Sequence, residues 1–185
     1  MFEDIKKDAT TRMANCIANL KEHYKHMRTG RANVGLLDGI RVDYYGTETP
    51  LAQVANVTVE DSRTLMIAPW DKSMVPAIEK AIFKSDLGLT PNTAGTSIRL
   101  PLPAMTEERR REMIKVAKQE AENARVAVRN VRRDVMNELK EMLKEKLISQ
   151  DDEKRAHEEV QKLTDKHVAD VDAVFTEKEK EMLHV

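Results

Sequence analysis

Residues 105–148 contain the feature that most limits how this chain can fold, a long run of apolar residues spaced alternately three and four positions apart. The run consists of Ile114, Ala117, Ala121, Ala124, Val128, Val131 and Val135. A helix turns by about 100° per residue, so these side chains share one face. The spacing predicts a helix that is capped by Thr106 and packs on other helices through this face. At about 1.5 Å per residue the helix is roughly 60 Å long, more than a small globule needs.

Four arginines lie beside this apolar face, and we call them the arginine cluster: Arg125, Arg129, Arg132 and Arg133. No acidic residue occurs between Asn123 and Arg133, so we expect no acid to neutralise these guanidinium groups. Each guanidinium is a planar fork of donors that matches phosphate. The cluster therefore predicts nucleic-acid binding. The alternative is that these side chains bridge to glutamates of neighbouring helices.

Charge is distributed unevenly along the chain, although the formal net charge is only -1. Residues 105–133 hold nine Lys or Arg against five Asp or Glu, whereas residues 134–185 hold nine against fifteen. A basic patch within a balanced total is typical of a protein that binds a polyanion with one surface, although solvated helix faces produce the same asymmetry. Aromatic residues do not interleave with the arginines, which favours structured RNA over single strands bound by stacking.

Two further helices are predicted at the ends of the chain. One covers residues 2–28 and ends near Gly30, and the other begins at Ser149. The first has an apolar face made of Phe2, Ile5, Ala9, Met13, Cys16, Leu20, Tyr24 and Met27. The second has one made of Ala156, Val160, Leu163, His167, Val171 and Val174, with the stem of Lys178 buried. Three such faces predict an elongated antiparallel three-helix bundle. A dimeric coiled coil is the structural alternative.

Between the helical segments the apolar pattern changes to period two, which is typical of strands. We expect strands at residues 40–45, 54–59, 64–68 and 97–100, with a turn at 45–50 and a loop at 91–95. A helix should run from about Met74 to Ser85, capped by Asp71 or Ser73. The chain is thus predicted to be α+β with two domains: a discontinuous bundle of residues 1–30 and 105–185, and an inserted small β/α/β domain of residues 31–104. We expect hinge motion at the two connections. The hinge residues are Gly30, Arg31, Pro101, Leu102, Pro103, Ala104 and Met105.

Motifs for enzymatic chemistry are absent from the sequence. It has no Gly-rich phosphate loop, Gly-x-Ser-x-Gly, Cys-x-x-Cys or His-Glu-x-x-His. We therefore expect that the protein is not an enzyme and binds no cofactor or metal. A weaker alternative is a metal site formed by His23 and His26 together with His157 or His167. The single Cys16 and the charged residues 1–7 indicate a cytoplasmic protein without a membrane span. We expect a monomer.

The sequence resembles the bacterial ribosome recycling factor family over essentially its whole length. The stretches that carry the resemblance are RTGRA at 28–32, LLDGI at 36–40, YYGT at 44–47, VEDSRTL at 59–65, SDLGL at 85–89, LPAMTEERR at 102–110 and ARVAVRNVRRD at 124–134. The resemblance implies an L-shaped protein with a three-helix bundle as one arm and a β/α/β domain as the other. The two arms would be joined by two hinge strands.

The resemblance also implies a function. Such a protein binds the large ribosomal subunit after termination and, with elongation factor G and the GTP hydrolysed by that partner, splits the ribosome and helps release mRNA and tRNA. The ribosomal-RNA contacts would fall first on Arg132 and Arg129, with Arg28 beside them, and more weakly on Arg31, Arg125 and Arg133. The alternative is a helical adaptor that binds RNA or protein outside recycling.

Overall fold

The computed structural model describes residues 2–27, 29 and 31–183. Contacts divide the chain into two compact units. The first unit consists of Met1–Tyr24 and Ile114–Glu181, and the second of Lys25–Met113 with Met182–Val185. Helical segments therefore flank a small sheet-containing unit, and the predicted α+β fold is confirmed. The contact boundaries fall inside the helices, six to nine residues from those expected at residues 30 and 105.

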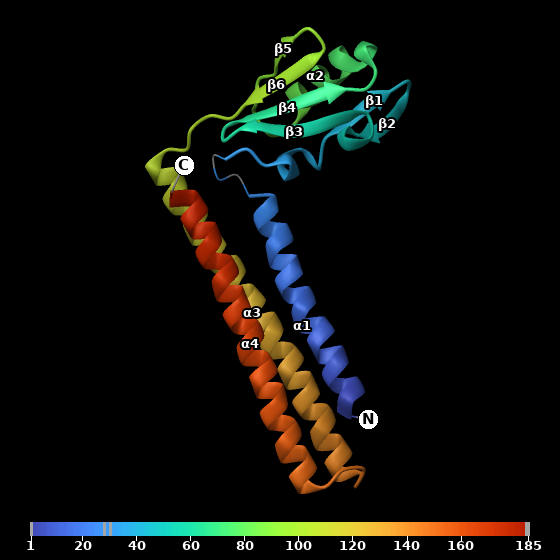
Figure 1. The fold of residues 1–185 in the computed structure, drawn as a ribbon, viewed down its shortest axis with the longest axis vertical. Helices are drawn as coiled ribbons and strands as arrows, with labels where there is room; N and C mark the ends of the chain where they lie inside the picture. Colours follow the sequence, from blue (N-terminus) through green and yellow to red (C-terminus); the bar gives the residue numbers. More distant parts are fainter. Residues whose placement is uncertain (1, 28, 30, 184–185) are drawn as a thin grey trace. The chain divides into compact units, whose positions relative to one another are not determined.

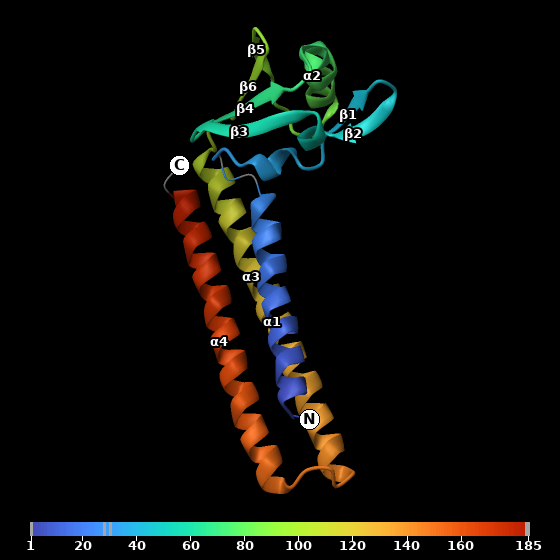
Figure 2. The same cartoon turned by 45° about the vertical axis from the view of Figure 1, so that its right-hand side comes forward.

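The first unit is a bundle of three helices (Figure 1). They are α1 (Phe2–Lys25), α3 (Glu107–Lys144) and α4 (Gln150–Leu183). Helix α3 runs antiparallel to the other two, and both views show the three helices side by side (Figure 2). The predicted bundle is confirmed, but α1 ends at Lys25 and α3 at Lys144, each earlier than the sequence pattern indicated.

Apolar side chains from all three helices form the core of the bundle. Fully or nearly fully buried are Ala9, Met13, Val128, Val131, Val135, Leu139, Met142, Ala156 and Val160. Burying a Val, Leu or Met side chain stabilises a fold by about 1.5–3 kcal/mol. Small residues at Ala117 and Ala121, both with no exposed area, let the helix backbones approach closely. The expected burial of the Lys178 stem is confirmed, since 8% of its side chain is exposed while its amine lies 3.6 Å from Glu181.

Polar contacts also join the helices of the bundle. Arg12 of α1 pairs with Asp134 of α3 at 2.7 Å, and Lys6 of α1 lies 3.7 Å from Glu159 of α4. At the other end of α1 the buried Tyr24 hydroxyl donates to the Ala117 carbonyl of α3 at 2.6 Å. Burial raises the pKa of Tyr24 to about 12. The turn before α4 is closed by a capping box, in which Ser149 and Asp152 each bond the other's backbone N–H.

The second unit contains a four-stranded antiparallel sheet in the order β3-β4-β6-β5 and a separate hairpin. The sheet strands are β3 (Ala55–Asp61), β4 (Thr64–Pro69), β5 (Asn92–Ala94) and β6 (Ser97–Pro101). The hairpin consists of β1 (Arg41–Tyr44) and β2 (Thr47–Pro50), and α2 spans Val75–Lys84. Three short 3-10 helices cover Val34–Leu37, Leu51–Gln53 and Lys72–Met74.

Helix α2 packs on one face of the sheet. Ile78 and Ile82 meet a core that includes Leu65, Ile67 and Ile98, all without exposed area. The expected cap of this helix by Asp71 or Ser73 is wrong, because the N-cap of α2 is Met74, which makes no side-chain capping bond. Asp71 instead caps the preceding 3-10 helix, where its Oδ1 accepts from Ser73 N at 3.0 Å.

Strands β2 and β5 correct the sequence prediction, which assigned residues 45–50 to a turn and 91–95 to a loop. The turn is tighter than expected, because Tyr45 and Gly46 both have positive φ (49° and 89°) and form a two-residue hairpin connection. Thr47 can then pair with Tyr44 at once. Both strands are short and polar, so they lack the apolar alternation by which strands are recognised.

Within the second unit, the segments on either side of the strands are bonded to the same turn. Ala32 N donates to Ser62 O at 2.8 Å, and Leu102 N donates to Arg63 O at 2.7 Å. Pro101 is the last residue of β6, so Pro103–Thr106 is the stretch left between the sheet and α3. Of the predicted hinge residues, Gly30 lies outside the described residues and Arg31 is exposed.

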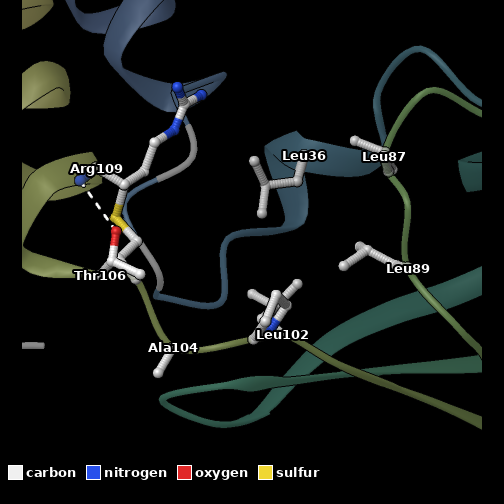
Figure 3. A pocket seen from close by; sticks show the side chains of 9 residues that line it. Leu36, Leu87, Leu89, Leu102, Ala104, Thr106 and Arg109 are labelled. Carbon is white, nitrogen blue, oxygen red and sulfur yellow. Dashed lines mark hydrogen bonds between the residues drawn. The ribbon is translucent and has the colours of Figure 1, made fainter.

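A pocket of about 400 Å³ lies in the second unit beside this stretch (Figure 3). Its lining is mainly apolar and includes Leu36, Leu87, Leu89, Leu102 and Met105. Arg109 and Thr106 stand at one side, where the Thr106 hydroxyl accepts from Arg109 N at 3.1 Å and caps α3 as the sequence predicted.

Candidate nucleic-acid interface

The arginine cluster lies on α3, on the side of the helix next to its buried face. Arg125 and Arg132 are half-buried, while Arg129 and Arg133 are exposed. The helix that carries them is held on its apolar face by Ala124, Val128, Val131 and Val135, which are all buried. The four guanidinium groups are therefore mounted on a segment whose backbone is fixed by core packing.

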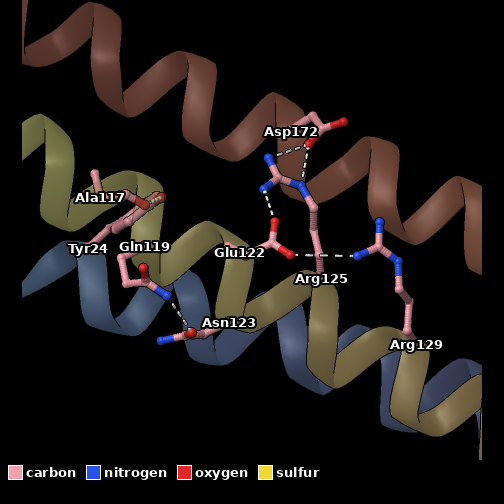
Figure 4. Close-up of polar contacts among 8 residues, drawn as sticks. All are labelled: Tyr24, Ala117, Gln119, Glu122, Asn123, Arg125, Arg129 and Asp172. Atoms are coloured by element: carbon pink, nitrogen blue, oxygen red, sulfur yellow. Dashed lines mark hydrogen bonds and ion pairs between the residues drawn. The ribbon is translucent and has the colours of Figure 1, made fainter.

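Arg125 is held by two carboxylates (Figure 4). One of its terminal nitrogens lies 2.6 Å from Asp172 of α4, and another lies 3.0 Å from Glu122 one turn earlier on α3. Burial by itself lowers the pKa of Arg125, but the hydrogen bonds to Asp172 and Glu122 outweigh it and hold that pKa above its usual value. The expectation that no acid neutralises the cluster is wrong at Arg125.

The positions of the two acidic residues explain that error. Glu122 stands one residue outside the acid-free stretch, yet on a helix it lies a turn from Arg125 and within reach of Arg129. Asp172 belongs to a different helix, so only the packing of α3 on α4 brings it close. The acidic composition of α4 was the available hint.

Arg129 is more open to solvent. Half of its side chain (51%) is exposed, and the acid paired with it is Glu122 at 3.7 Å, drawn in Figure 4 as a dashed line from Glu122 to Arg129. An exposed pair at that distance is weak and is screened by salt. Arg133 is exposed too, and within the described part of the chain no acid comes within ion-pair distance of it.

Arg132 is bonded in a third way, through a neutral side chain. Its Nε donates to Oε1 of Gln161 on α4 at 2.8 Å. Gln161 in turn donates from Nε2 to Asp165 at 2.9 Å. Among the described residues no carboxylate lies within ion-pair distance of Arg132, so its charge is oriented but not neutralised. Sequence reasoning missed Gln161, because a glutamine on an acidic helix gives no signal.

The remaining candidate residues divide between the described and the undescribed parts of the chain. Arg28 lies outside the described residues, and Arg31 is exposed in the second unit. Of the histidines weighed as metal ligands, His167 is buried and its Nδ1 is bonded to the Leu163 carbonyl at 2.8 Å. Because it is buried and bonded within its own helix, His167 is a core residue of α4. None of the helices in residues 2–183 that the structure describes combines the length and the apolar character needed to cross a bilayer.

The fold and this surface together define a class of protein, a helical bundle with a basic face and an inserted α+β domain. The family model described as ribosome recycling factor matches residues 20–183. The chain is 57% identical to the ribosome-recycling factor of Legionella pneumophila (strain Paris) and 57% identical to that of Thioalkalivibrio sulfidiphilus, over 185 residues and the full length of both chains in each case.

Solved structures agree with the sequence comparisons. A solution structure of the ribosome recycling factor matches with a TM-score of 0.78 and 41% identity, covering 100% of this chain and 98% of that one. A second match, with a TM-score of 0.69, 41% identity and 99% of each chain covered, is a model of the Thermus thermophilus factor with Escherichia coli elongation factor G bound to the post-termination complex. This chain belongs to the ribosome recycling factor family.

Proposed function

We propose that this protein binds the large ribosomal subunit of post-termination complexes and, with elongation factor G, splits the ribosome and helps release mRNA and tRNA. Support comes from full-length similarity to ribosome-recycling factors and from the matched structure placed with elongation factor G on a post-termination complex. The partner hydrolyses the GTP, so this chain needs no catalytic residue and is not an enzyme. It acts in the cytoplasm as a monomer.

The proposed RNA-contacting residues are the arginines of the sequence prediction, now ranked by how free their guanidinium groups are. Arg132 and Arg129 come first, because the former has no carboxylate partner among the described residues and the latter only a distant one. Arg28 lies outside the described residues and keeps its proposed place beside these two, while Arg133 and Arg31 follow as exposed cations. Arg125 contributes least to RNA binding, because Glu122 and Asp172 already engage it. The observation that carries the proposal is the pair of available arginines on a rigid helix.

The domain division and the hinges complete the proposal. We assign residues 1–30 and 105–185 to the bundle that holds the RNA, and residues 31–104 to the inserted domain. The hinge residues remain Gly30, Arg31 and Pro101–Met105. In this arrangement the bundle works as a strut, which requires the continuous apolar core found along α3.

Salt dependence tests whether the partner is RNA. Phosphate contacts make the logarithm of affinity fall linearly with the logarithm of salt concentration. We expect binding to purified large ribosomal subunits to weaken steeply and linearly on this scale as KCl is raised. A nearly salt-independent affinity would contradict RNA binding by the arginine cluster and favour the alternative, an adaptor that binds protein through apolar surface.

A further inference from the structure

One side chain of α4 touches the arginine cluster without cancelling its charge. Gln161 accepts from Arg132 Nε at 2.8 Å, whereas the contacts from α4 and α3 to Arg125 come from the carboxylates Asp172 and Glu122. An amide oxygen carries no net charge, so it orients a guanidinium while leaving its full positive charge for another partner. Arg125 and Arg132 lie seven residues apart on one helix, yet α4 pairs the first with a carboxylate and the second with a neutral amide.

The orientation of the Gln161 amide is itself fixed. Its Nε2 donates to Oδ1 of Asp165 at 2.9 Å. A carboxylate only accepts, so the amide must turn its NH₂ group toward Asp165 and its oxygen toward Arg132. Gln161 and Asp165 are four residues apart and therefore neighbours on the surface of α4. Asp165 thus orients the Gln161 amide, and Gln161 in turn holds the Arg132 guanidinium at its Nε.

A guanidinium held at Nε keeps both terminal nitrogens for another acceptor. These two nitrogens form the fork that binds two oxygens of one phosphate. Arginine also loses considerable rotamer freedom when it is ordered, and a side chain ordered before binding does not lose that freedom at the binding step. The described residues place no acid against Arg132, so nothing among them competes with a phosphate for the fork.

We infer that Gln161, oriented by Asp165, is a positioning residue that pre-orders Arg132 for a backbone phosphate of ribosomal RNA. The inference rests on the proposed function. Gln161 itself is not required to touch RNA. Its effect passes through the rotamer of Arg132, and this makes the inference separable from a general role of Gln161 in bundle stability.

The test compares variants of the full-length chain for binding to purified large ribosomal subunits across a KCl series. In Gln161→Leu the oxygen that orients Arg132 is lost while the side-chain size is kept. Because Arg132 must then be ordered during binding, affinity should fall by about three- to tenfold. The salt slope should stay unchanged, since the arginine is still present, and so should the thermal midpoint. Gln119→Leu is the matched control, because the Gln119 amide likewise donates to a side chain four residues on, Asn123, at 3.0 Å.

A double-mutant cycle with Arg132→Ala shows whether Gln161 affects binding through Arg132. In the Arg132→Ala background, Gln161→Leu should cost no further affinity. Unchanged binding of Gln161→Leu, or the same loss in both backgrounds, would overturn the inference while leaving the role of Arg132 intact. Unchanged binding of Arg132→Ala would instead remove the RNA contact on which the proposed function relies, and the inference with it.

Discussion

Arg125 and Arg132 lie on the same face of α3, yet their guanidinium groups are engaged differently. Arg125 has 22% of its side chain exposed and is bonded to Asp172 and Glu122, so it serves as a clamp between α3 and α4. Arg132 is oriented by the neutral Gln161 and keeps its charge. Arginines that look equivalent on a helical wheel thus separate into a structural one and one available for binding.

The first prediction concerns Arg132. Arg132→Ala should weaken binding to the large ribosomal subunit by about 1 to 3 kcal/mol, as expected for the loss of a charge-assisted contact. The thermal midpoint should change little, because the core residues of α3 are untouched. Equilibrium binding and thermal unfolding of the same variant check both points. Normal affinity combined with a strongly lowered midpoint would show that Arg132 is structural.

The second prediction concerns Tyr24. Its pKa is raised to about 12, so the folded state binds the phenolic proton more tightly than the unfolded chain does. The stability that this proton supplies is complete below pH 10 and is lost as the pH rises through 12. The thermal midpoint should therefore fall across this range, and it should fall less in Tyr24→Phe. At pH 7 that variant should be about 1 kcal/mol less stable, because one buried hydrogen bond to Ala117 is lost. Identical pH profiles for the two proteins would contradict the stabilising role of the Tyr24 proton.

At the scale of elements, the long helices were predictable from sequence because their apolar faces repeat over many turns. The face of α3 from Ala117 to Val135 is buried as expected, and the Thr106 and Ser149 caps are found where the sequence indicated. Strands β2 and β5 were not predictable, because each is short and is defined by its partner strand and a tight turn rather than by its own pattern. The partners of the arginines were missed for a similar reason, since Asp172 and Gln161 reach α3 only through tertiary packing.

The third prediction concerns the turn between α3 and α4. Ser149→Ala removes the hydroxyl that accepts from Asp152 N at 3.1 Å and leaves the first turn of α4 without its cap. The free energy of unfolding should fall by about 1 kcal/mol, the usual cost of losing a serine N-cap. Chemical denaturation measures this change in the free energy of unfolding. Ser149→Asp is the control, because aspartate caps equally well and should restore most of the loss. Equal losses in the two variants would contradict the capping role.

At the scale of the whole molecule, the proposed domain division leaves two connections, one at residues 30–31 and one after β6 that contains Pro103. The hydrogen bonds of Ala32 and Leu102 to the turn at Ser62 and Arg63 bind both connections to the second unit. Within the proposed hinges, Pro101 ends β6 and Leu102 is bonded to Arg63, so motion is expected to concentrate at residues 30–31 and 103–105. We propose that this motion lets the inserted domain move while the bundle stays on RNA.

The fourth prediction follows from that hinge. Backbone NMR relaxation should give different effective tumbling for the inserted domain and the bundle, because the proposed hinges let the two domains reorient independently. Replacing Ala104 by proline should reduce the difference by restricting the backbone there. Relaxation that fits a single rigid body in the unsubstituted protein would contradict the hinge proposal.

The central claim is that a stiff bundle, bound to ribosomal RNA through arginine, takes part in splitting the ribosome when elongation factor G hydrolyses GTP. The most direct measurement is light scattering of post-termination ribosomes mixed with the protein, elongation factor G and GTP. Subunit dissociation should require all three components and should be strongly slowed by the Arg129→Ala/Arg132→Ala double variant. Ribosomes that stay intact with the complete mixture, or dissociation at the normal rate with the double variant, would contradict the account.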